Sequence, residues 1–490
     1  MTAIEKWGAT EDLNLKMVIG GKRLESSNAA RIETEDPATG RVIGSFPAAT
    51  ADDVGRAVEN SRAALKGEWR AMTPTARGRV LARAAAILRR EAGRLARIET
   101  LDSGKPLREA KGDMETSASY FEYYAGFADK LQGDSIPLGP DYMSFTLHEP
   151  VGVTAHIIPW NFPLTTTARG VAPALAAGCT AVVKPAALTS LTSILLADIL
   201  EEAGLPAGVY NVVPGHGREA GAALVSHPDI AHVTFTGSVA TGIGIMQSAA
   251  RHVASVTLEL GGKSPLVVLA DADLDAAVEG TLKAIYMNAG QVCSAGSRLV
   301  IERRVHAAMM ERLVPRVEAM RPGHGLDDPA IGPLVSAAQV KIVADFVEDA
   351  RKANSLNVVA GGCRLTPEGM ERGHFYAATI IDDAPKDARV VQEEIFGPVL
   401  TVQIVESPEE AIAVANGTEF GLCAGIYTRD ISRAMTFARD VDAGQVFINQ
   451  YFAGGVPTPF GGTKMSGFGR EKGLAALASY YRVKCITTRL

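Results

Sequence analysis

From residue 151 the chain reads Val151-Gly152-Val153-Thr154-Ala155-His156-Ile157-Ile158-Pro159-Trp160-Asn161-Phe162-Pro163. Residues 151–158 are apolar and β-rich, which favours a strand, and Pro159 ends that strand because proline has no backbone N–H to donate. More short apolar runs follow, separated by helical patterns, at 181–183, 209–213 and 232–235. Strands that alternate with helices form a parallel sheet with both faces covered. We therefore expect an α/β fold that binds its ligands at the carboxyl ends of these strands.

A second α/β series begins near Ser264. It contains strand-like runs at Leu266–Leu269 and Leu299–Glu302 and a helical run at Asp273–Met287, and it ends near the glycine-rich stretch 459–473. A chain of 490 residues is too long for one hydrophobic core. The two series therefore predict two α/β domains.

Other segments lie outside these two series. Leu81, Leu88 and Leu95 recur at seven-residue steps, which predicts an amphipathic helix. The isolated strand-like segments Ser144–Glu149 and Val483–Leu490 each need a partner edge. Together they predict an oligomerisation arm.

Composition restricts the class of protein. Hydrophobic residues make up 47% and charged residues 21%, as in soluble globular proteins. The net charge of -6 argues against nucleic acid and anionic membranes as partners. No apolar run is long enough to span a membrane, and Met1–Lys22 lacks the apolar core of a signal peptide, so we expect a cytoplasmic protein.

Cysteine usage leaves one open question. The number of cysteines is odd, and no two of them have metal-like spacing: Cys179, Cys293, Cys363, Cys423 and Cys485. A disulfide framework or a zinc site is therefore not expected, and the site residues include no metal ligand. What remains is whether one thiol is a nucleophile.

Three residues could form a catalytic site. Cys293 follows Asn288-Ala289-Gly290-Gln291-Val292. Small residues there leave a thiol accessible, and they let backbone N–H groups point at a bound oxygen. Glu259 ends the run Val256–Leu260 before a glycine turn, where a carboxylate can act as a base. Asn161 is held between two prolines, and its amide could stabilise an oxyanion. Taken singly, each residue also fits a structural role: a buried thiol, a salt-bridged glutamate and a turn asparagine.

The motifs together resemble the aldehyde dehydrogenase superfamily over nearly the whole chain. They occur in order at family-like spacing: Pro159–Pro163, Gly178–Thr180 with Lys184-Pro185, Phe235–Ser238, Leu258–Lys263, Gly290–Cys293, Glu393–Pro398, and Pro459–Gly462 followed by Lys464, Ser466-Gly467 and Gly469–Glu471. Each motif is weak alone, and the ordered set is specific. The resemblance implies a Rossmann-like cofactor domain (residues 1–128 and 149–260), an α/β catalytic domain (261–470) and a β arm (129–148 and 471–490) that builds homodimers or homotetramers.

The same resemblance implies a mechanism. The Cys293 thiolate attacks a small-molecule aldehyde, and the Asn161 amide and the Cys293 N–H hold the oxyanion. Hydride transfer to NAD or NADP leaves a thioester, which water activated by Glu259 hydrolyses to a carboxylic acid. His156 and His216 lie near the motifs and are expected to be structural.

The implied cofactor site departs from the usual fingerprint. Gly215–Ala220 fits G-x-G-x-x-A, which is weak evidence alone. By resemblance, the lysine contacts the adenosine ribose, the helix start faces the pyrophosphate and the glutamate grips the nicotinamide ribose; the assigned residues are Trp160, Lys184, Ala187, Gly217, Gly237, Ser238, Gly242, Glu394 and Phe396. Many NAD-preferring relatives carry a glutamate where this chain has Ala187. Because that negative charge is missing, NADP should be tolerated better.

The expected aldehyde tunnel begins on a helix after Pro163. Helical spacing puts Phe162, Thr166 and Arg169 on one stripe. The other residues implied to line the tunnel are Met287, Val292, Ser294 and Phe452.

Arg169 has two readings. It could pair with the distal carboxylate of a semialdehyde, or it could tie its helix to the interdomain linker. Semialdehyde enzymes can use a second arginine at the position of Met287, and its absence weakens the first reading. A trimethylammonium substrate would want an aromatic cage, for which the tunnel offers only Phe162, Phe452 and Trp160.

Two rival functions are kept open. A CoA-acylating relative would pass the thioester to CoA and would not need a base at Glu259. A catalytically silent protein on the same scaffold would not need Cys293, Glu259 and Asn161 together. The intact trio favours a hydrolytic enzyme.

Overall fold

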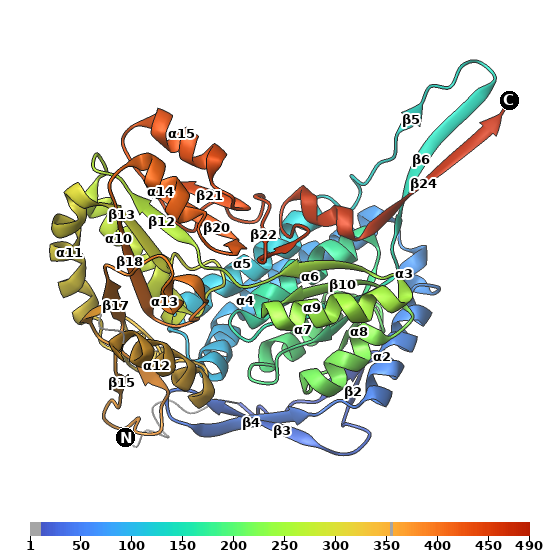
Figure 1. Ribbon diagram of the computed structural model, residues 1–490. Coiled ribbons are helices and arrows are strands. Elements are labelled where there is room, and N and C mark those ends of the chain that lie inside the picture. The colour runs from blue at the N-terminus through green and yellow to red at the C-terminus, as the bar shows by residue number, and fades with distance from the viewer. Residues whose placement is uncertain (1–10, 353–355) are drawn as a thin grey trace.

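The computed structural model describes residues 11–352 and 356–490, and Figure 1 shows two α/β lobes and a projecting arm. The segment Met1–Lys22 is the one in which no signal peptide is expected, and its residues 1–10 lie outside the described residues. The larger lobe has an eight-stranded sheet in the order β2-β1-β9-β8-β7-β10-β11-β23. Its strands are β1 (Met17–Ile19), β2 (Lys22–Leu24), β7 (Val153–Ile157), β8 (Thr180–Lys184), β9 (Tyr210–Val212), β10 (Ile230–Thr236), β11 (Ser255–Glu259) and β23 (Gly467–Phe468).

The middle of this sheet is parallel, as the alternating pattern predicts. Strands β9, β8, β7, β10 and β11 pair in parallel, so their carboxyl ends meet at one edge. Register places Ile157 beside Lys184, and Thr236 beside Glu259. β23 belongs in sequence to the second series, yet it pairs antiparallel with β11. The C-terminal segment thus returns to the first lobe next to Glu259.

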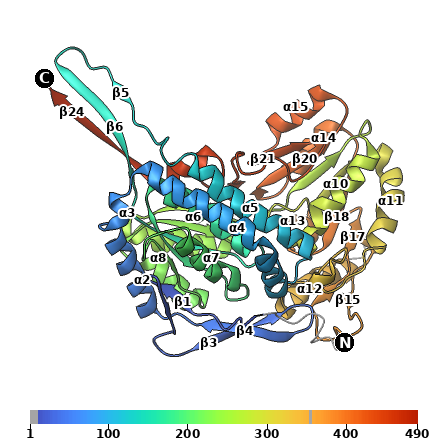
Figure 2. The ribbon, with the colours of Figure 1, turned by 180° about the vertical axis from the view of Figure 1, so that it is seen from behind.

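Helices cover both faces of the larger sheet. One face carries α4 (Pro74–Ser103), α5 (Leu107–Ala125), α6 (Pro163–Ala177) and α7 (Leu191–Glu202), and Figure 2 shows α4 and α5 lying across the back of the lobe. The other face carries α2 (Ala51–Ala64), α8 (Ala222–Ser226) and α9 (Val239–Ala249), with α3 (Glu68–Ala71) following α2. Along β8, Val183 faces the first set and Val182 the second, the two-residue alternation of a strand covered on both faces.

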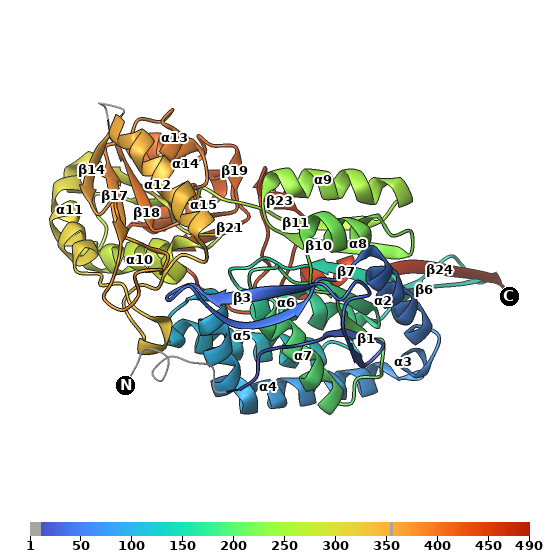
Figure 3. The same ribbon diagram turned by 90° about the horizontal axis from the view of Figure 1, so that it is seen from below.

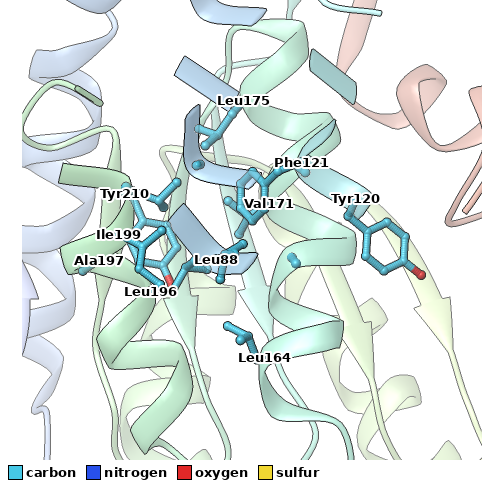
Figure 4. Packing of buried hydrophobic residues seen from close by; sticks show 14 of the residues in the cluster. Leu88, Tyr120, Phe121, Leu164, Val171, Leu175, Leu196, Ala197, Ile199 and Tyr210 are labelled. Carbon is cyan, nitrogen blue, oxygen red and sulfur yellow. The ribbon is translucent and has the colours of Figure 1, made fainter. Parts of the chain in front are cut away.

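The core on the α4–α7 face is close-packed. Figure 4 shows Leu88 of α4, Phe121 of α5, Leu164 of α6 and Leu196 of α7 meeting there. The predicted leucine stripe is confirmed, because Leu81, Leu88 and Leu95 are all fully buried. Truncating one such leucine to alanine costs about 2–5 kcal/mol of unfolding free energy. This core anchors α6, the helix that begins at the active site.

The smaller lobe contains a seven-stranded sheet in the order β14-β17-β18-β13-β12-β20-β21. All neighbouring pairs except β14 with β17 are parallel. Its strands are β12 (Pro265–Val268), β13 (Arg298–Glu302), β14 (Asn357–Ala360), β17 (Thr379–Asp382), β18 (Val399–Val405), β20 (Cys423–Tyr427) and β21 (Gln445–Ile448). Its helices are α10 (Leu274–Tyr286), α11 (Arg303–Glu318), α12 (Ala337–Lys352), α13 (Arg389–Gln392), α14 (Pro408–Ala415) and α15 (Ile431–Asp440).

Small hairpins complete the two lobes. Strands β3 (Arg31–Asp36) and β4 (Arg41–Pro47) form a hairpin that runs along the lower edge of the molecule in Figure 1 and crosses the middle of the view from below in Figure 3. The remaining two-stranded pieces are β15 (Arg364–Leu365) with β16 (Phe375–Tyr376), and β19 (Phe420–Gly421) with β22 (Thr463–Lys464). Among the described residues, no helix is both long and apolar enough to cross a membrane.

The arm is a three-stranded antiparallel sheet of β5 (Ser135–Ile136), β6 (Tyr142–Pro150) and β24 (Tyr481–Arg489). The two predicted arm segments are strands, and they pair with each other from Pro150–Tyr481 to Tyr142–Arg489. The sheet projects away from both lobes (Figure 1). Apolar side chains on it are exposed, among them Met143, Leu147 and Val483.

Candidate active site

Both lobes contribute to a cavity of about 270 Å³. The first lobe supplies residues of α5 and α6, and the second supplies the loops at 287–294 and 445–460. The predicted tunnel residues line this cavity together with two of the predicted catalytic residues: Phe162, Thr166, Arg169, Met287, Val292, Ser294 and Phe452, with Asn161 and Cys293. Residues that lie far apart in the sequence therefore surround one space that could hold a small substrate.

Cys293 follows a strained loop. Asn288, Ala289 and Gly290 have φ angles of 48°, 53° and 74°, the left-handed region that non-glycine residues seldom adopt. A side chain at Gly290 would place its Cβ 2.1 Å from the Gly397 carbonyl oxygen, so only glycine fits there. Strain of this kind persists only where the surrounding structure imposes it, and here it presents the Cys293 thiol to the cavity.

Burial is the largest influence on the Cys293 thiol. It raises the pKa of the thiol to about 12; the Arg169 charge acts in the opposite direction, and the carboxyl groups of Glu394 and Glu259 raise it further. The thiol therefore needs a base to take its proton before it can attack a carbonyl carbon.

Asn161 is held from both ends. Its side-chain amide donates to the Gln291 carbonyl at 2.9 Å. Its own carbonyl accepts from Lys105 Nζ at 2.9 Å and from Asn288 Nδ2 at 3.1 Å. An amide carries two N–H protons, so one remains for an oxygen in the cavity beside Cys293.

Lys105 is a buried cation that the sequence analysis did not single out. Its ammonium lies 2.5 Å from Asp113 Oδ2, 3.4 Å from Glu99 Oε1 and 4.3 Å from the centre of the Phe162 ring. Asp113 and Glu99 hold the Lys105 side chain in place, and from that position its ammonium donates to the Asn161 carbonyl.

Replacing Lys105 with methionine is expected to lower kcat/KM about tenfold or more, because the Asn161 carbonyl loses its charged donor. It should also cost about 3–5 kcal/mol of unfolding free energy, since Glu99 and Asp113 keep buried charges without their partner. Kinetics normalised to folded enzyme and thermal unfolding measure the two effects. Lys111→Met, at an exposed site on α5, is the matched control. A lower melting temperature with unchanged kcat/KM would mean that Lys105 only stabilises the fold.

Glu259 ends β11, as predicted, and is 1% exposed. Neither of its carboxyl oxygens has a hydrogen-bond partner among the described residues. A Cβ at Gly461 would lie 2.9 Å from Glu259 Oε1, so the glycine backbone closes over this carboxyl group. Burial is the main cause that raises the pKa of Glu259 well above the ordinary value, and repulsion from Glu471 adds to it. A buried acid without a partner costs free energy of folding, and such groups recur where chemistry needs them.

Protein groups already engage the Arg169 guanidinium, which favours the second of its two readings. Its guanidinium is ion-paired with Glu471, donates to Thr236 Oγ1 at 3.0 Å and lies 5.2 Å from the centre of the Phe460 ring. Burial disfavours the charged guanidinium, but the attraction of Glu471 together with those of Tyr120, Glu259 and Cys293 outweighs it and raises the pKa of Arg169. The arginine ties α6 to the C-terminal segment, which is close to the alternative reading.

The predicted cofactor residues lie along the carboxyl edge of the larger sheet. Lys184 ends β8, and its Cδ lies beside Gly221 in the short helical turn Gly217–Gly221 that contains Gly217. Ser238 caps α9 by accepting from Thr241 N, Gly237 precedes it, and Gly242 is buried in the first turns of this helix. Ala187 is half-buried in the loop that follows Lys184.

The other cofactor residues come from the second lobe and the loop after β7. Phe396, with a φ of 58°, makes an edge-to-face contact with Trp160 at 5.2 Å between ring centres. Gly262 N donates to Glu394 Oε1 at 3.0 Å, and burial raises the pKa of Glu394 to about 7.

These residues fit a nicotinamide dinucleotide. The first backbone N–H groups of α9 have no intrahelical partner, and Ser238 beside them is exposed, which suits a pyrophosphate. Lys184 supplies a donor near the end of β8, and burial lowers the pKa of its amine to about 8. The Trp160–Phe396 pair and Glu394 supply stacking and acceptor groups near Gly262.

Sequence reasoning missed several side chains of this site. Glu471 and Phe460 belong to quoted motifs, but no role was assigned to them; Lys105, Asp113 and Lys472 were not considered. A glycine–lysine–proline turn followed by acids four and eight residues later marks Lys105 in the sequence. Nothing local indicates that the lysine is buried under Asn161, because that contact depends on packing between α4, α5 and α6.

Comparisons with known proteins agree with this geometry. A model described as the aldehyde dehydrogenase family matches residues 24–486. DhaS of Bacillus subtilis, assigned as an aldehyde dehydrogenase, is 41% identical over 478 residues, which cover 97% of this chain and 96% of DhaS.

Solved structures match over nearly the whole chain. A Burkholderia cenocepacia protein assigned as an aldehyde dehydrogenase is 46% identical with a TM-score of 0.95, covering 97% of this chain and 99% of the other. An aldehyde dehydrogenase from Bacillus cereus, solved as an NAD+ complex, is 40% identical with a TM-score of 0.95, covering 100% and 99%.

Proposed function

This chain belongs to the aldehyde dehydrogenase family, and on that premise we propose that it forms a thioester on Cys293 which water hydrolyses to a carboxylic acid. As a member of that family it is an NAD(P)-dependent enzyme that oxidises aldehydes. The observation that carries the hydrolytic proposal is the unpartnered, buried carboxyl of Glu259 within electrostatic range of the Cys293 thiol.

The first step is addition of the thiol to the aldehyde. Once the Cys293 thiol has lost its proton to solvent, its sulfur bonds to the carbonyl carbon, and the carbonyl oxygen becomes an oxyanion. The second N–H of the Asn161 amide and the Cys293 backbone N–H are the proposed donors to that oxygen. A bound nicotinamide supplies the acceptor for the hydride that leaves the former aldehyde carbon, so that a thioester remains on Cys293.

The second step is hydrolysis. Deprotonated Glu259 takes a proton from water, whose oxygen attacks the thioester carbon, and the Cys293 sulfur leaves. Glu471 raises the pKa of Glu259, whereas Arg169 lowers it. Burial is the main cause of the raised pKa of Glu259, and the Arg169–Glu471 ion pair adjusts that pKa by holding a charge of each sign beside the carboxyl group.

Product analysis tests this proposal against its rivals. Aldehydes with NAD+ or NADP+, without CoA, should yield carboxylic acid and reduced cofactor in equal amounts. Reduced cofactor that forms only with CoA, together with acyl-CoA as the product, would favour the acylating rival, and an unreactive Cys293 with no reduced cofactor from any aldehyde would favour the silent one. A base at Glu259 has no task in the acylating reaction, which is the reason to favour hydrolysis.

Both nicotinamide cofactors are proposed to bind, with NADP tolerated because Ala187 presents no negative charge. Ala187→Glu is expected to lower the ratio of kcat/KM for NADP to that for NAD by roughly ten- to a hundredfold, or about 1–3 kcal/mol, through repulsion of the 2′-phosphate. Steady-state kinetics with both cofactors measures the ratio, and Ala187→Gln controls for the size of the new side chain. If the ratio stays the same, Ala187 does not face the ribose.

We also propose that the arm joins a second copy of this chain into a homodimer or homotetramer. The exposed Met143, Leu147 and Val483 give the arm an apolar surface that would be covered in an assembly. Sedimentation of the intact protein over a range of concentrations measures the state.

A further inference from the structure

Two cations from neighbouring segments approach the Phe460 ring in the substrate cavity. Arg169 lies 5.2 Å and Lys472 Nζ 5.8 Å from its centre, and both residues line the cavity. Arg169 is ion-paired with Glu471. Within residues 11–352 and 356–490, the Lys472 ammonium has neither an ion pair nor a side-chain hydrogen bond.

Among the described residues Lys472 has no ion pair of its own, although the charge of Glu471 attracts its ammonium. The carboxylate of Asp113, which also lines the cavity, lies 2.5 Å from Lys105 Nζ. Glu471 forms its ion pair with Arg169. Burial lowers the pKa of Lys472 to about 8, so the ammonium form still prevails at neutral pH. An anion that entered the cavity would therefore meet a cation that forms no direct ion pair with any carboxylate of the described residues.

The backbone on both sides of Lys472 is fixed. Glu471 and Phe460 exchange backbone hydrogen bonds of 2.6 and 2.7 Å. Gly473 N donates to the Val456 carbonyl at 2.8 Å, and the Gly473 carbonyl accepts from Tyr124 Oη at 2.9 Å. Lys472 itself has a φ of 64°, a conformation that a lysine adopts only when its surroundings impose it. The backbone that carries Lys472 is thus fixed beside the cavity, so binding has to order only the lysine side chain and not the segment.

We propose that Lys472 selects aldehydes that carry a distal carboxylate, with its ammonium as the partner of that carboxylate. The inference rests on the proposed function, because the aldehyde end of the substrate must reach Cys293. Phe162, Phe447 and Phe452 line the walls of the cavity, so the segment between aldehyde and carboxylate is apolar, such as a chain of methylenes. Lys472 thus takes the role that the sequence suggested for Arg169, which is to bind the distal carboxylate. No sequence pattern around Lys472 indicates this role.

The same charge disfavours cationic aldehydes. A trimethylammonium group would meet an ammonium inside a partly buried cavity, where repulsion is stronger than in water. Neutral aldehydes of the same shape would meet no such penalty. A preference for negative over positive aldehydes of the same shape therefore distinguishes this proposal from selection of substrates by size alone.

Matched aldehyde pairs test the proposal. The carboxylates 4-oxobutanoate, 5-oxopentanoate and 6-oxohexanoate are compared with their uncharged shape analogues 4-methylpentanal, 5-methylhexanal and 6-methylheptanal. Betaine aldehyde is compared with 3,3-dimethylbutanal. The measured quantity is the ratio of kcat/KM within each pair, for wild type, Lys472→Met and Lys472→Arg, with Lys386→Met, an exposed site, as the control for net charge.

In wild type, kcat/KM for at least one carboxylate should exceed kcat/KM for its uncharged analogue. For betaine aldehyde, kcat/KM should be lower than for 3,3-dimethylbutanal. Lys472→Met should lower the best carboxylate ratio about tenfold or more, mainly through KM, and raise the betaine aldehyde ratio. Lys472→Arg should retain most of the carboxylate preference. Unchanged ratios in Lys472→Met, including an equal loss for both members of each pair, would overturn the inference. Failure of every aldehyde to reduce NAD+ or NADP+ would instead count against the proposed function.

Discussion

Cys293→Ala is expected to lower kcat by about four orders of magnitude or more, because alanine cannot form the bond to the aldehyde carbon. Cofactor binding should persist, since the residues proposed to hold the dinucleotide, such as Lys184, Ser238 and Glu394, lie on other segments. Steady-state turnover gives the first quantity, and calorimetric titration with NAD+ gives the second.

The exposed Cys363 offers a matched control, because Cys363→Ala removes a thiol outside the cavity. Iodoacetamide labelling adds a direct readout, with loss of activity expected to follow alkylation of Cys293. If Cys293→Ala turned over within tenfold of wild type, another nucleophile would have to be sought. Of the other cysteines, Cys423 has the closest electrostatic link to Cys293, and burial raises its pKa far above the ordinary value.

Glu259→Gln is expected to leave a burst of reduced cofactor followed by turnover about a hundred- to ten-thousandfold slower, because the amide cannot take a proton from water. The pH dependence has a definite sign. The raised pKa of Glu259 means that its basic form accumulates only as the pH rises well above the ordinary range of a glutamate, so wild-type deacylation should accelerate with pH. In Glu259→Gln this rise should disappear from the deacylation rate. Stopped-flow measurement at several pH values separates burst and steady rate.

Stability supplies an independent readout for the same variant. The pKa of Glu259 is higher in the folded protein than in the unfolded chain, so folding takes up a proton and stability falls as the pH rises above the unfolded value. Glutamine removes this penalty, and the melting temperature at neutral pH should stay or rise. Glu419→Gln, at an exposed position, is the control. Loss of the burst together with an unchanged steady rate would contradict the hydrolytic role.

The local elements of the fold could be predicted from sequence. Apolar runs bounded by proline and glycine gave β7, β8, β9 and β10 to within a few residues, and the leucine period gave α4. These signals are local, because side chains alternate along a strand and recur along a helix wherever one face is buried. The position of β23 could not be predicted in this way, since a two-residue strand in a glycine-rich tail has no period to detect.

In the candidate site, too, local features could be predicted from the sequence and long-range contacts could not. Helical spacing predicts that Phe162, Thr166 and Arg169 share a face, and the structure places all three on the cavity. What Arg169 contacts is a different question. Its partner Glu471 follows 302 positions later, and no periodicity links the two segments.

The amino-acid sequence alone is sufficient for the α/β architecture, which depends on apolar runs at short, regular spacing, and for the family, which depends on an ordered set of motifs. The catalytic roles of Cys293, Glu259 and Asn161 follow from the resemblance to that family and stand as proposals. Whether a charge near the substrate is available or already paired depends on how α6 meets the C-terminal segment. Packing pairs Arg169 with Glu471 and leaves Lys472 without an ion pair among the described residues. Ion pairs form across space between residues that the chain separates, so the availability of Lys472 could be recognised only in the folded structure.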